Sequence, residues 1–262
     1  MNQISVFGLN IDNISLSEAS KGIIHAARAS TRRRIYFVNA HCVNVAAIDA
    51  DYLSVLQGAT SLFADGIGMR LAAQWAGLSL VDNVNGTDLF PIICRDAAAA
   101  GVAIGLLGAR PGIAQQCADN MKQQFPDLKI AWIQDGYFEP GTEADMIAAV
   151  NDSGAQILFV AMGVPLQELW IARHAGSLKA PVLLGVGALF DFYSGAVPRA
   201  PLLMRKWGLE WLFRLMIEPR RLFRRYVLGN PIFIFRALWR RLRGKEALQK
   251  NPLQKHPVRN DV

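Results

Sequence analysis

The feature that most restricts the fold of this chain is a regular alternation of short apolar runs with longer segments of helical periodicity. Runs of four to six mainly apolar residues are typical of strands that are buried on both faces of a sheet. We expect strands at residues 4–8, 34–38, 61–64, 102–107, 130–133, 157–162 and 182–186. Their alternation with helices predicts an α/β fold whose parallel sheet is covered by helices on both faces.

The expected helices are marked by signals at their ends. Ser15 and Glu18 form a capping-box pattern, which predicts a helix that begins there and runs to about Ala29. A second helix is expected to begin at Asp49 or Asp51, and others are expected at residues 87–100 and 143–151. One more follows the turn at Gly108 and ends at about Phe125, and the last runs from Gly163 through Trp170.

The pattern changes after Pro198 and Pro201, where only helical periodicity remains. We therefore divide the chain into a core, residues 1–200, and an appendage, residues 201–262, which includes a flexible tail. At or beyond Arg205 lie 15 of the 28 Lys and Arg residues and 4 of the 21 Asp and Glu residues, which leaves 13 basic and 17 acidic residues before it. This asymmetry favours a polyanionic partner, such as a membrane surface, a phosphorylated substrate or nucleic acid.

Large apolar side chains alternate with the basic ones in the appendage. Leu209, Leu212 and Met216 share one helical face, and the run from Arg220 to Arg225 follows them. A basic, aromatic-rich amphipathic helix lies in the membrane interface, and no apolar run is long enough to predict a spanning helix. We expect peripheral attachment to the anionic inner leaflet, at the cytoplasmic face of the cell membrane. The alternative is a helix packed on the core; nucleic acid is not an expected partner, because no nucleic-acid-binding motif accompanies the arginines.

Polar residues and glycines follow the expected strands, at the ends where parallel sheets bind their ligands. Asn39 and Asp65 each come directly after a strand. The Asp65 carboxylate either stands in a crevice as a proton acceptor or caps the next helix, and the spacing alone does not decide between the two. Turns at Gly108 and Gly163 lead into helix N-termini that could hold a phosphate, and the Gln167 amide could bind a sugar hydroxyl or a uracil edge.

Other kinds of site find little support. The spacing of Gly105, Gly108 and Gly112 is not the G-x-G-x-x-G of nicotinamide and flavin enzymes. Asp49 and Asp51 resemble a metal-binding D-x-D pair, but they fall at a helix start, where aspartate is expected as a cap. The 3 cysteines lack C-x-x-C spacing and the 4 histidines lack zinc-site spacing. We therefore expect neither a metal ion nor a cofactor.

Several motifs, in order along the chain, resemble those of the WecG/TagA/CpsF glycosyltransferases. The motifs are Asn39, Asp65-Gly-Ile-Gly, Gly86-Thr-Asp-Leu-Phe, Gly136-Tyr-Phe, Gly163-x-Pro-x-Gln-Glu-x-Trp, Phe190-Asp-Phe-Tyr-Ser-Gly and Pro198-Arg-Ala-Pro. The resemblance covers about residues 1–230. It implies a Rossmann-like core with a small membrane-associating helical appendage. It also implies an inverting, metal-independent enzyme that moves a sugar from a UDP donor to a polyprenyl-diphosphate-linked sugar.

The resemblance also implies roles for particular residues. Asp65 would be the general base, with Asn39 beside it. Arg214, Arg221 and Arg224 would meet the lipid diphosphate. The residues expected to bind substrate are Asn83, Thr87, Asp88, Gly108, Tyr137, Gln167 and Asp191.

Two positions bear on the identity of the donor. Family members that use N-acetylmannosamine often carry Arg where this chain has Asn83, and a family Thr is replaced by Phe37. The whole chain looks most like the branch that builds xanthan-type exopolysaccharides, so we favour transfer from UDP-glucose to glucosyl-diphosphate-polyprenol in a β-1,4 linkage. UDP-N-acetylmannosamine or its uronic acid is the alternative donor. A peripheral membrane scaffold is the non-enzymatic alternative, and formation of a homo-oligomer is left open.

Overall fold

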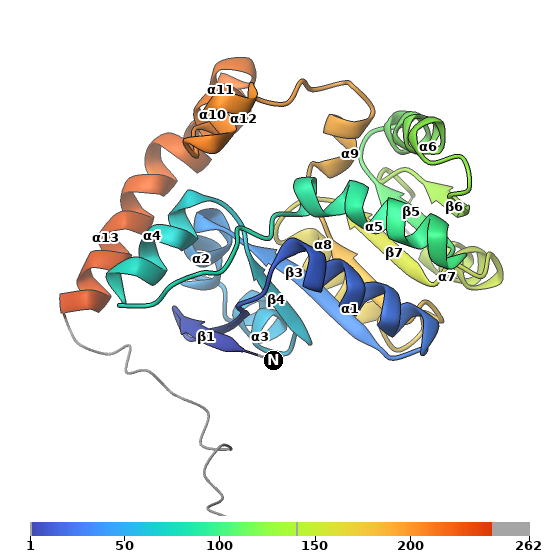
Figure 1. Ribbon diagram of the computed structural model, residues 1–262, viewed down its shortest axis with the longest axis horizontal. Coiled ribbons are helices and arrows are strands. Elements are labelled where there is room, and N and C mark those ends of the chain that lie inside the picture. The colour runs from blue at the N-terminus through green and yellow to red at the C-terminus, as the bar shows by residue number, and fades with distance from the viewer. Residues whose placement is uncertain (1, 140, 243–262) are drawn as a thin grey trace, which may run out of the picture.

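A six-stranded parallel sheet forms the centre of the computed structural model, which describes residues 2–139 and 141–242 (Figure 1). The strand order across the sheet is β4-β3-β8-β7-β5-β6, with all neighbouring strands parallel. The strands are β3 (Arg33–Val38), β4 (Ser61–Ala64), β5 (Ile104–Gly108), β6 (Ile130–Gln134), β7 (Ile157–Ala161) and β8 (Val182–Gly185). The predicted α/β fold is confirmed.

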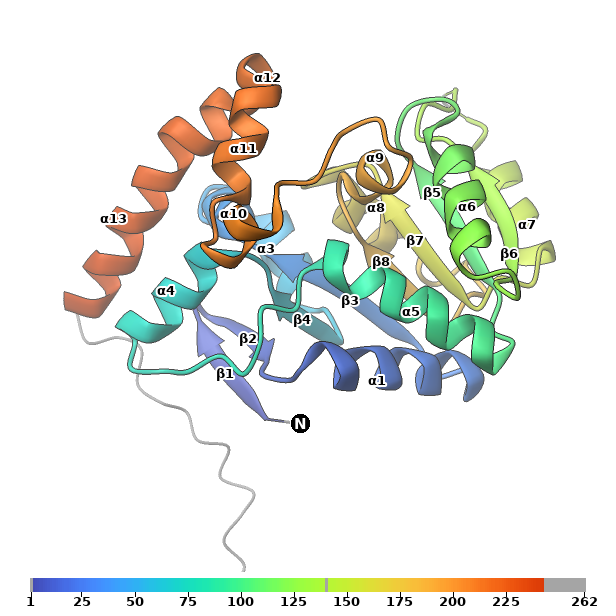
Figure 2. The same cartoon turned by 45° about the horizontal axis from the view of Figure 1, so that its top comes forward.

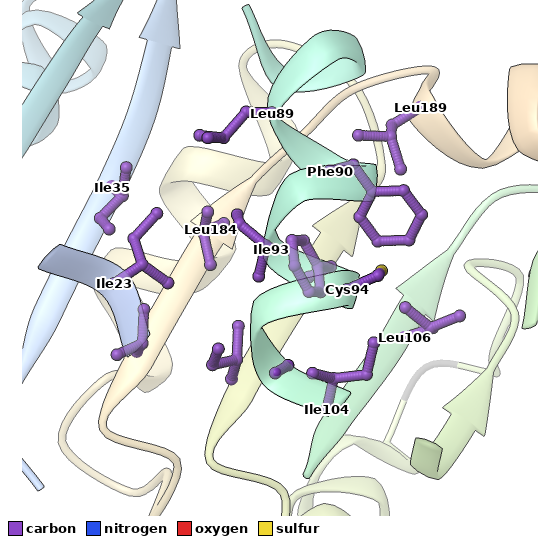
Figure 3. Close-up of a cluster of buried hydrophobic side chains, with 14 of the residues drawn as sticks. Ile23, Ile35, Leu89, Phe90, Ile93, Cys94, Ile104, Leu106, Leu184 and Leu189 are labelled. Atoms are coloured by element: carbon purple, nitrogen blue, oxygen red, sulfur yellow. The ribbon is translucent and has the colours of Figure 1, made fainter. Parts of the chain in front are cut away.

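Helices cover both faces of the sheet, because successive strand residues point to opposite sides. Ile35 and Phe37 of β3 pack into one buried cluster, whereas Tyr36 and Val38 pack into the other. The first cluster lies under α1 (Leu16–Arg28), α5 (Gly86–Ala100), α6 (Ile113–Gln124) and α9 (Leu189–Tyr193), and Figure 3 shows part of it. The second lies under α2 (Ala40–Ala46), α3 (Ala50–Gln57), α4 (Ile67–Trp75), α7 (Glu143–Asp152) and α8 (Leu166–His174).

The first expected strand lies outside the parallel sheet. Strand β1 (Gln3–Val6) ends at a turn in which Phe7 and Gly8 both have positive φ, of 57° and 76°. The chain then reverses into β2 (Leu9–Asp12), which pairs with β1 in antiparallel register. Two consecutive left-handed residues are what a tight hairpin turn requires. The apolar run at residues 4–8 predicted a strand, but the hairpin was missed because Phe rarely adopts this conformation.

Residues 201–242 are mainly helical, as their periodicity predicts. It forms α10 (Leu202–Lys206), α11 (Glu210–Ile217), α12 (Pro219–Phe223), a π-helical turn η1 (Arg224–Leu228) and α13 (Gly229–Leu242). Helix α13 runs beside α2 and α4 (Figures 1 and 2) and buries Phe233 and Ala237 in the second cluster. The appendage was also expected to include a flexible tail, and residues 243–262, at its end, lie outside the described residues.

Large apolar side chains on the appendage remain exposed to solvent. They include Leu202, Leu203, Trp207, Met216, Phe223 and Phe235. Among residues 2–139 and 141–242, no helix is both long and apolar enough to cross a bilayer. The appendage is therefore packed on the core along one side of α13, while the rest of α13 and the other helices keep exposed apolar side chains.

Candidate functional site

The two polar residues that follow β3 and β4 lie side by side. Strands β3 and β4 are parallel neighbours that end at Val38 and Ala64, so the next residues, Asn39 and Asp65, emerge at the same edge of the sheet. The Asn39 side-chain amide donates a hydrogen bond to Asp65 Oδ2 at 3.2 Å. The Asp65 backbone N–H donates to the Val38 carbonyl at 2.9 Å, which fixes the carboxylate at the strand end.

The structure decides between the two interpretations of Asp65. Helix α4 has Gly66, with φ of 88°, at its N-cap, and no side chain within the described residues caps it. The Asp65 carboxylate therefore does not cap this helix and faces Asn39. Burial is the largest influence on Asp65 and raises its pKa above the ordinary value, while the Asn39 hydrogen bond and the charge of Arg225 act in the opposite direction. A carboxyl with a raised pKa is suited to accept a proton.

Asn39 has a fixed orientation because its amide serves two partners. Its Oδ1 accepts hydrogen bonds from the backbone N–H groups of His41 and Cys42, at 3.0 and 3.2 Å, and thereby caps α2. With the oxygen held by the helix, the Nδ2 donor is directed to Asp65.

The turn after Asp65 is held from the other side by Asn83. The Asn83 Oδ1 accepts a hydrogen bond from the Gly66 backbone N–H at 2.7 Å. The Asn83 backbone N–H in turn donates to Asp82 Oδ1 at 2.8 Å, and Asp82 Oδ2 accepts from the Leu16 N–H at 3.3 Å. The predicted substrate residue Asn83 therefore also positions the turn that carries Asp65.

Asp65 opens into a cavity of about 680 Å³ between the core and the appendage. We call it the appendage cavity: its walls come from the ends of β3 and β4, from α4, and from α11, η1 and α13. Of the residues predicted from the sequence, those that line it are Asn39, Asp65, Asn83, Thr87 and Arg214. The structure thus brings the predicted base and one of the predicted diphosphate-binding arginines to the same cavity.

Further polar residues of this cavity that the sequence did not assign to the site include His41, Arg205, Glu210 and Arg225. Burial, together with the charge of Arg225, lowers the pKa of His41 to about 4, so that this imidazole is neutral at physiological pH. Within the described part of the chain, the Nε atoms of Arg205, Arg214 and Arg225 are buried without a hydrogen-bond partner. These guanidinium groups retain donors for an anionic ligand.

The other two predicted arginines lie nearby but do not belong to the cavity wall. Arg221 pairs with Glu218, and Arg224 is exposed at the start of the π-helical turn. A π-helical turn changes the angle between successive side chains, so an ideal helical period does not predict that Arg225 lines the cavity. A role for Arg221 and Arg224 in binding the lipid diphosphate stays a prediction.

Asp88 joins the core to the appendage. Its carboxylate accepts hydrogen bonds from the Asn85 amide and from Arg199, each at 2.7 Å, and Arg205 approaches to 3.7 Å. Arg199 also contacts Glu210 of α11 at 3.4 Å. Burial acts to raise the pKa of Asp88, but the hydrogen bonds from Asn85 and Arg199 outweigh it and hold this pKa below its ordinary value. The position is structural, and substrate binding by Asp88 stays a prediction.

The remaining predicted residues lie at the other strand ends. Gly108 ends β5 with φ of 128°, and a Cβ there would collide with the Ala161 backbone. Tyr137 follows β6 and is 72% exposed, and Asp191 lies 3.8 Å from Arg110. The Gln167 amide is buried and accepts hydrogen bonds from the N–H groups of Gly163 and Gly187, so it shapes two loops after β7 and β8.

Asp49 behaves as its position at a helix start predicts. Its Oδ1 accepts a hydrogen bond from the Tyr52 backbone N–H at 2.9 Å and caps α3. The D-x-D pair therefore has a structural explanation in the helix that it starts.

A family model for the WecG/TagA/CpsF glycosyl transferases matches residues 4–247 of this chain. The chain belongs to this family. Membership makes the protein a glycosyltransferase and implies, in general terms, a UDP-sugar donor and a lipid-linked acceptor. The match covers both the core and the described appendage, so all the residues that line the cavity between them lie within the matched region. Because the family is enzymatic, the scaffold alternative is set aside.

Proposed function

We propose that this WecG/TagA/CpsF glycosyltransferase moves glucose from UDP-glucose to the glucose of glucosyl-diphosphate-polyprenol, with formation of a β-1,4 linkage in exopolysaccharide synthesis. The observation that carries the proposal is the Asp65 carboxylate, half-buried beside Asn39 and open to a cavity that also holds arginines. A base next to arginine side chains suits transfer from a nucleotide donor to an alcohol.

The proposed reaction is a single displacement with inversion. The acceptor hydroxyl oxygen attacks the anomeric carbon from the face opposite UDP, and Asp65 takes its proton as the new C–O bond forms. The bond between the anomeric carbon and UDP breaks, and its electron pair leaves with the UDP oxygen. Base catalysis of this kind typically accelerates a reaction about 10²–10⁴-fold.

Negative charge that develops on the leaving UDP needs compensation. Arg205 lines the cavity wall and supplies a cationic group for this charge, whereas Arg214 and Arg225 remain for the acceptor diphosphate. Preorganised cationic donors stabilise such charge without reorganisation during the reaction. The proposed mechanism is metal-independent, with the loops at Gly108 and Gly163 as further contacts for the phosphates of UDP. We assign Tyr137, Gln167 and Asp191, which lie beyond the carboxyl ends of the strands, to binding of the UDP-sugar donor.

Glucose is the favoured donor sugar because neither Asn83 nor Phe37 supplies the cation that a negatively charged sugar would need at these two positions. The Asn83 Oδ1 accepts a hydrogen bond from the Gly66 N–H, so this residue presents only an uncharged NH2 group. Phe37 is buried against Phe63 and leaves no polar group at the position of the family Thr. Both features support UDP-glucose over UDP-N-acetylmannosaminuronic acid, while UDP-N-acetylmannosamine remains the second candidate.

The proposal is tested by measuring transfer from a panel of radiolabelled UDP-sugars to a synthetic glucosyl-diphosphate-polyprenol, with product extracted into organic solvent. We expect glucose to be transferred fastest, and preferential transfer of N-acetylmannosamine would overturn the donor assignment. Activity that is abolished by EDTA and restored by Mg²⁺ would contradict the metal-independent mechanism.

The base assignment is tested by Asp65→Asn in the same assay. We expect kcat to fall about 10²–10⁴-fold, because Asn cannot accept the proton at neutral pH. Asp49→Asn is the matched control, since Asn also caps helices well and α3 should be unaffected. Near-normal turnover by a folded Asp65→Asn variant would show that another group is the base.

A further inference from the structure

The appendage cavity has walls of two chemical kinds. One part of the wall is polar and carries Asp65, Asn39 and His41, and the charges of Arg214 and Arg225 act on Asp65 from the appendage. Another part of the wall is apolar. Its side chains are Leu71 and Trp75 of α4, Trp211, Leu212 and Leu215 of α11, Val227 of η1 and Ile234 of α13.

The apolar wall does not match the polar parts of either substrate. A sugar or a diphosphate placed against these side chains would lose hydrogen bonds to water without replacement, at a cost of about 1–3 kcal/mol for each group. An apolar ligand would instead gain about 25 cal/mol for each Å² of surface removed from water. The apolar end of the cavity therefore fits a hydrocarbon portion of a ligand.

The sequence of chemical groups along the cavity identifies that ligand. The charges of Arg225 and Arg214 act on the Asp65 carboxyl, so these arginines lie near it, whereas Leu71 and Trp75 lie about 6 and 12 Å along α4 from the start of that helix. A prenyl-diphosphate-linked sugar has its parts in the same order, with a sugar hydroxyl, a diphosphate and a hydrocarbon chain.

We propose that the apolar end of the appendage cavity binds the first isoprene units of the lipid carrier. The diphosphate then lies at Arg214 and Arg225, and the tail passes between α4 and α11 before it enters the bilayer. This inference rests on the proposed function, because that function supplies the lipid-linked acceptor.

The helix α4 connects the two ends of the site. Its N-terminus follows Asp65 and Gly66, whereas Leu71 and Trp75, one turn apart, line the apolar wall. One rigid element thus spans the distance between the proposed base and the proposed tail site. A tail bound along α4 would restrain how far the sugar hydroxyl can lie from the carboxylate.

The experiment measures the binding of soluble ligands to the full-length protein by calorimetry, without a membrane. The probes are inorganic pyrophosphate, geranyl diphosphate and farnesyl diphosphate, below the concentrations at which they form micelles. We expect farnesyl diphosphate to bind at least tenfold more tightly than pyrophosphate, with geranyl diphosphate between them. Equal dissociation constants for the three probes would overturn the proposal.

Two adjacent residues of α11 provide a matched pair of variants. Leu215 lines the cavity, whereas Met216 is 61% exposed on the outer surface. Leu215→Asp should remove the gain in affinity between pyrophosphate and farnesyl diphosphate, and Met216→Asp should retain it. If Leu215→Asp does not fold, Leu71→Trp, which narrows the same wall with an apolar group, should also reduce the gain. A gain that persists in the folded cavity variants would overturn the proposal.

The outcomes distinguish this inference from the proposed function. If affinity increases with tail length but glucose is not transferred from UDP-glucose, the glucosyltransferase assignment fails and the tail site stands. If glucose is transferred but affinity does not depend on the tail, the tail site fails and the proposed function stands.

Discussion

At the scale of single residues, the Asn39 side-chain amide makes hydrogen bonds both to the N-terminus of a helix and to a carboxylate. Its oxygen caps α2 and its nitrogen donates to Asp65. We predict that Asn39→Asp retains the cap but places a second carboxylate beside Asp65, which raises the pKa of the pair. The acid limb of the dependence of kcat on pH should therefore move to higher pH, while the urea midpoint changes little. An unchanged acid limb would mean that Asn39 does not influence the base.

Glu168 is a second residue whose protonation matters, because it is a buried residue of α8 and one of its carboxyl oxygens has no partner among the described residues. Burial raises its pKa to about 7 from an ordinary 4.5, although the hydrogen bond from Gln167 acts against this. The native state thus favours the protonated form. The associated stability is complete below pH 4.5 and is lost as the pH rises through 7.

This shift in the pKa of Glu168 corresponds to a decrease of about 3 kcal/mol in the free energy of unfolding between pH 5 and pH 8. We predict that Glu168→Gln, which stays neutral, weakens this pH dependence of the free energy of unfolding, measured with urea at both values. The control Glu139→Gln alters an exposed carboxyl and should leave the dependence as in the wild type. The same slope in all three proteins would exclude Glu168 as its source.

Sequence reasoning at this scale identified positions better than orientations. Asn39 and Asp65 could be predicted because parallel strands align the residues that follow them. The direction of the Asp65 side chain could not be, since capping and exposure require the same spacing. Gln167 shows the same limit: its place after β7 was predicted, but the burial of its amide against Gly163 and Gly187 depends on contacts between distant segments.

At the scale of elements, the apolar runs predicted all six strands of the parallel sheet to within about two residues. Helices α2 and α4 were not predicted. Helix α2 follows Asn39 with no intervening loop, and α4 begins at the glycine-rich segment Gly66–Gly68, which lacks an ordinary capping residue. These short helices carry much of the cavity wall, so the shape of the site could not be derived from the helix pattern.

Arg199, in the segment that follows α9, joins helix α5 to helix α11 through ion pairs. Its guanidinium contacts Asp88 at 2.7 Å and Glu210 at 3.4 Å, and its side chain is 20% exposed. We predict that Arg199→Met lowers the free energy of unfolding by about 1–2 kcal/mol, between the values for exposed and buried ion pairs. Urea denaturation measures this loss.

The exposed pair of Arg95 with Asp96 provides the comparison for that junction, because the Arg95 side chain is 64% exposed. Arg95→Met should change the free energy of unfolding by less than about 1 kcal/mol. Equal losses for the two variants would show that the junction is no more important than a surface ion pair.

At the scale of the whole molecule, the appendage cavity exists because helix α13 of the appendage packs against the core. Phe233 and Ala237 of α13 enter the same buried cluster as residues of β3 and α2. The sequence predicted a separate basic, amphipathic segment, and its charge and periodicity do indicate a surface role. They do not reveal which apolar residues pack on the core, because that choice depends on the direction of the chain after η1. Removal of the appendage would expose part of the core, so its surface role is better tested with point variants.

The exposed apolar side chains of α10 and α11 are the surface on which the whole molecule would meet a bilayer. Leu203, Trp207 and Met216 are each about 60% exposed and lie among arginines. We predict that replacing all three with Ser weakens flotation with anionic vesicles at least tenfold, because apolar burial and cationic attraction act together at a membrane interface. The matched control replaces Ile48 and Val81, exposed apolar residues of the core, with Ser. Binding of the wild type should also weaken as salt rises from about 0.1 to 0.5 M. If the core and appendage variants lost flotation equally, the contact would be non-specific and the acceptor would have to reach the cavity by another route.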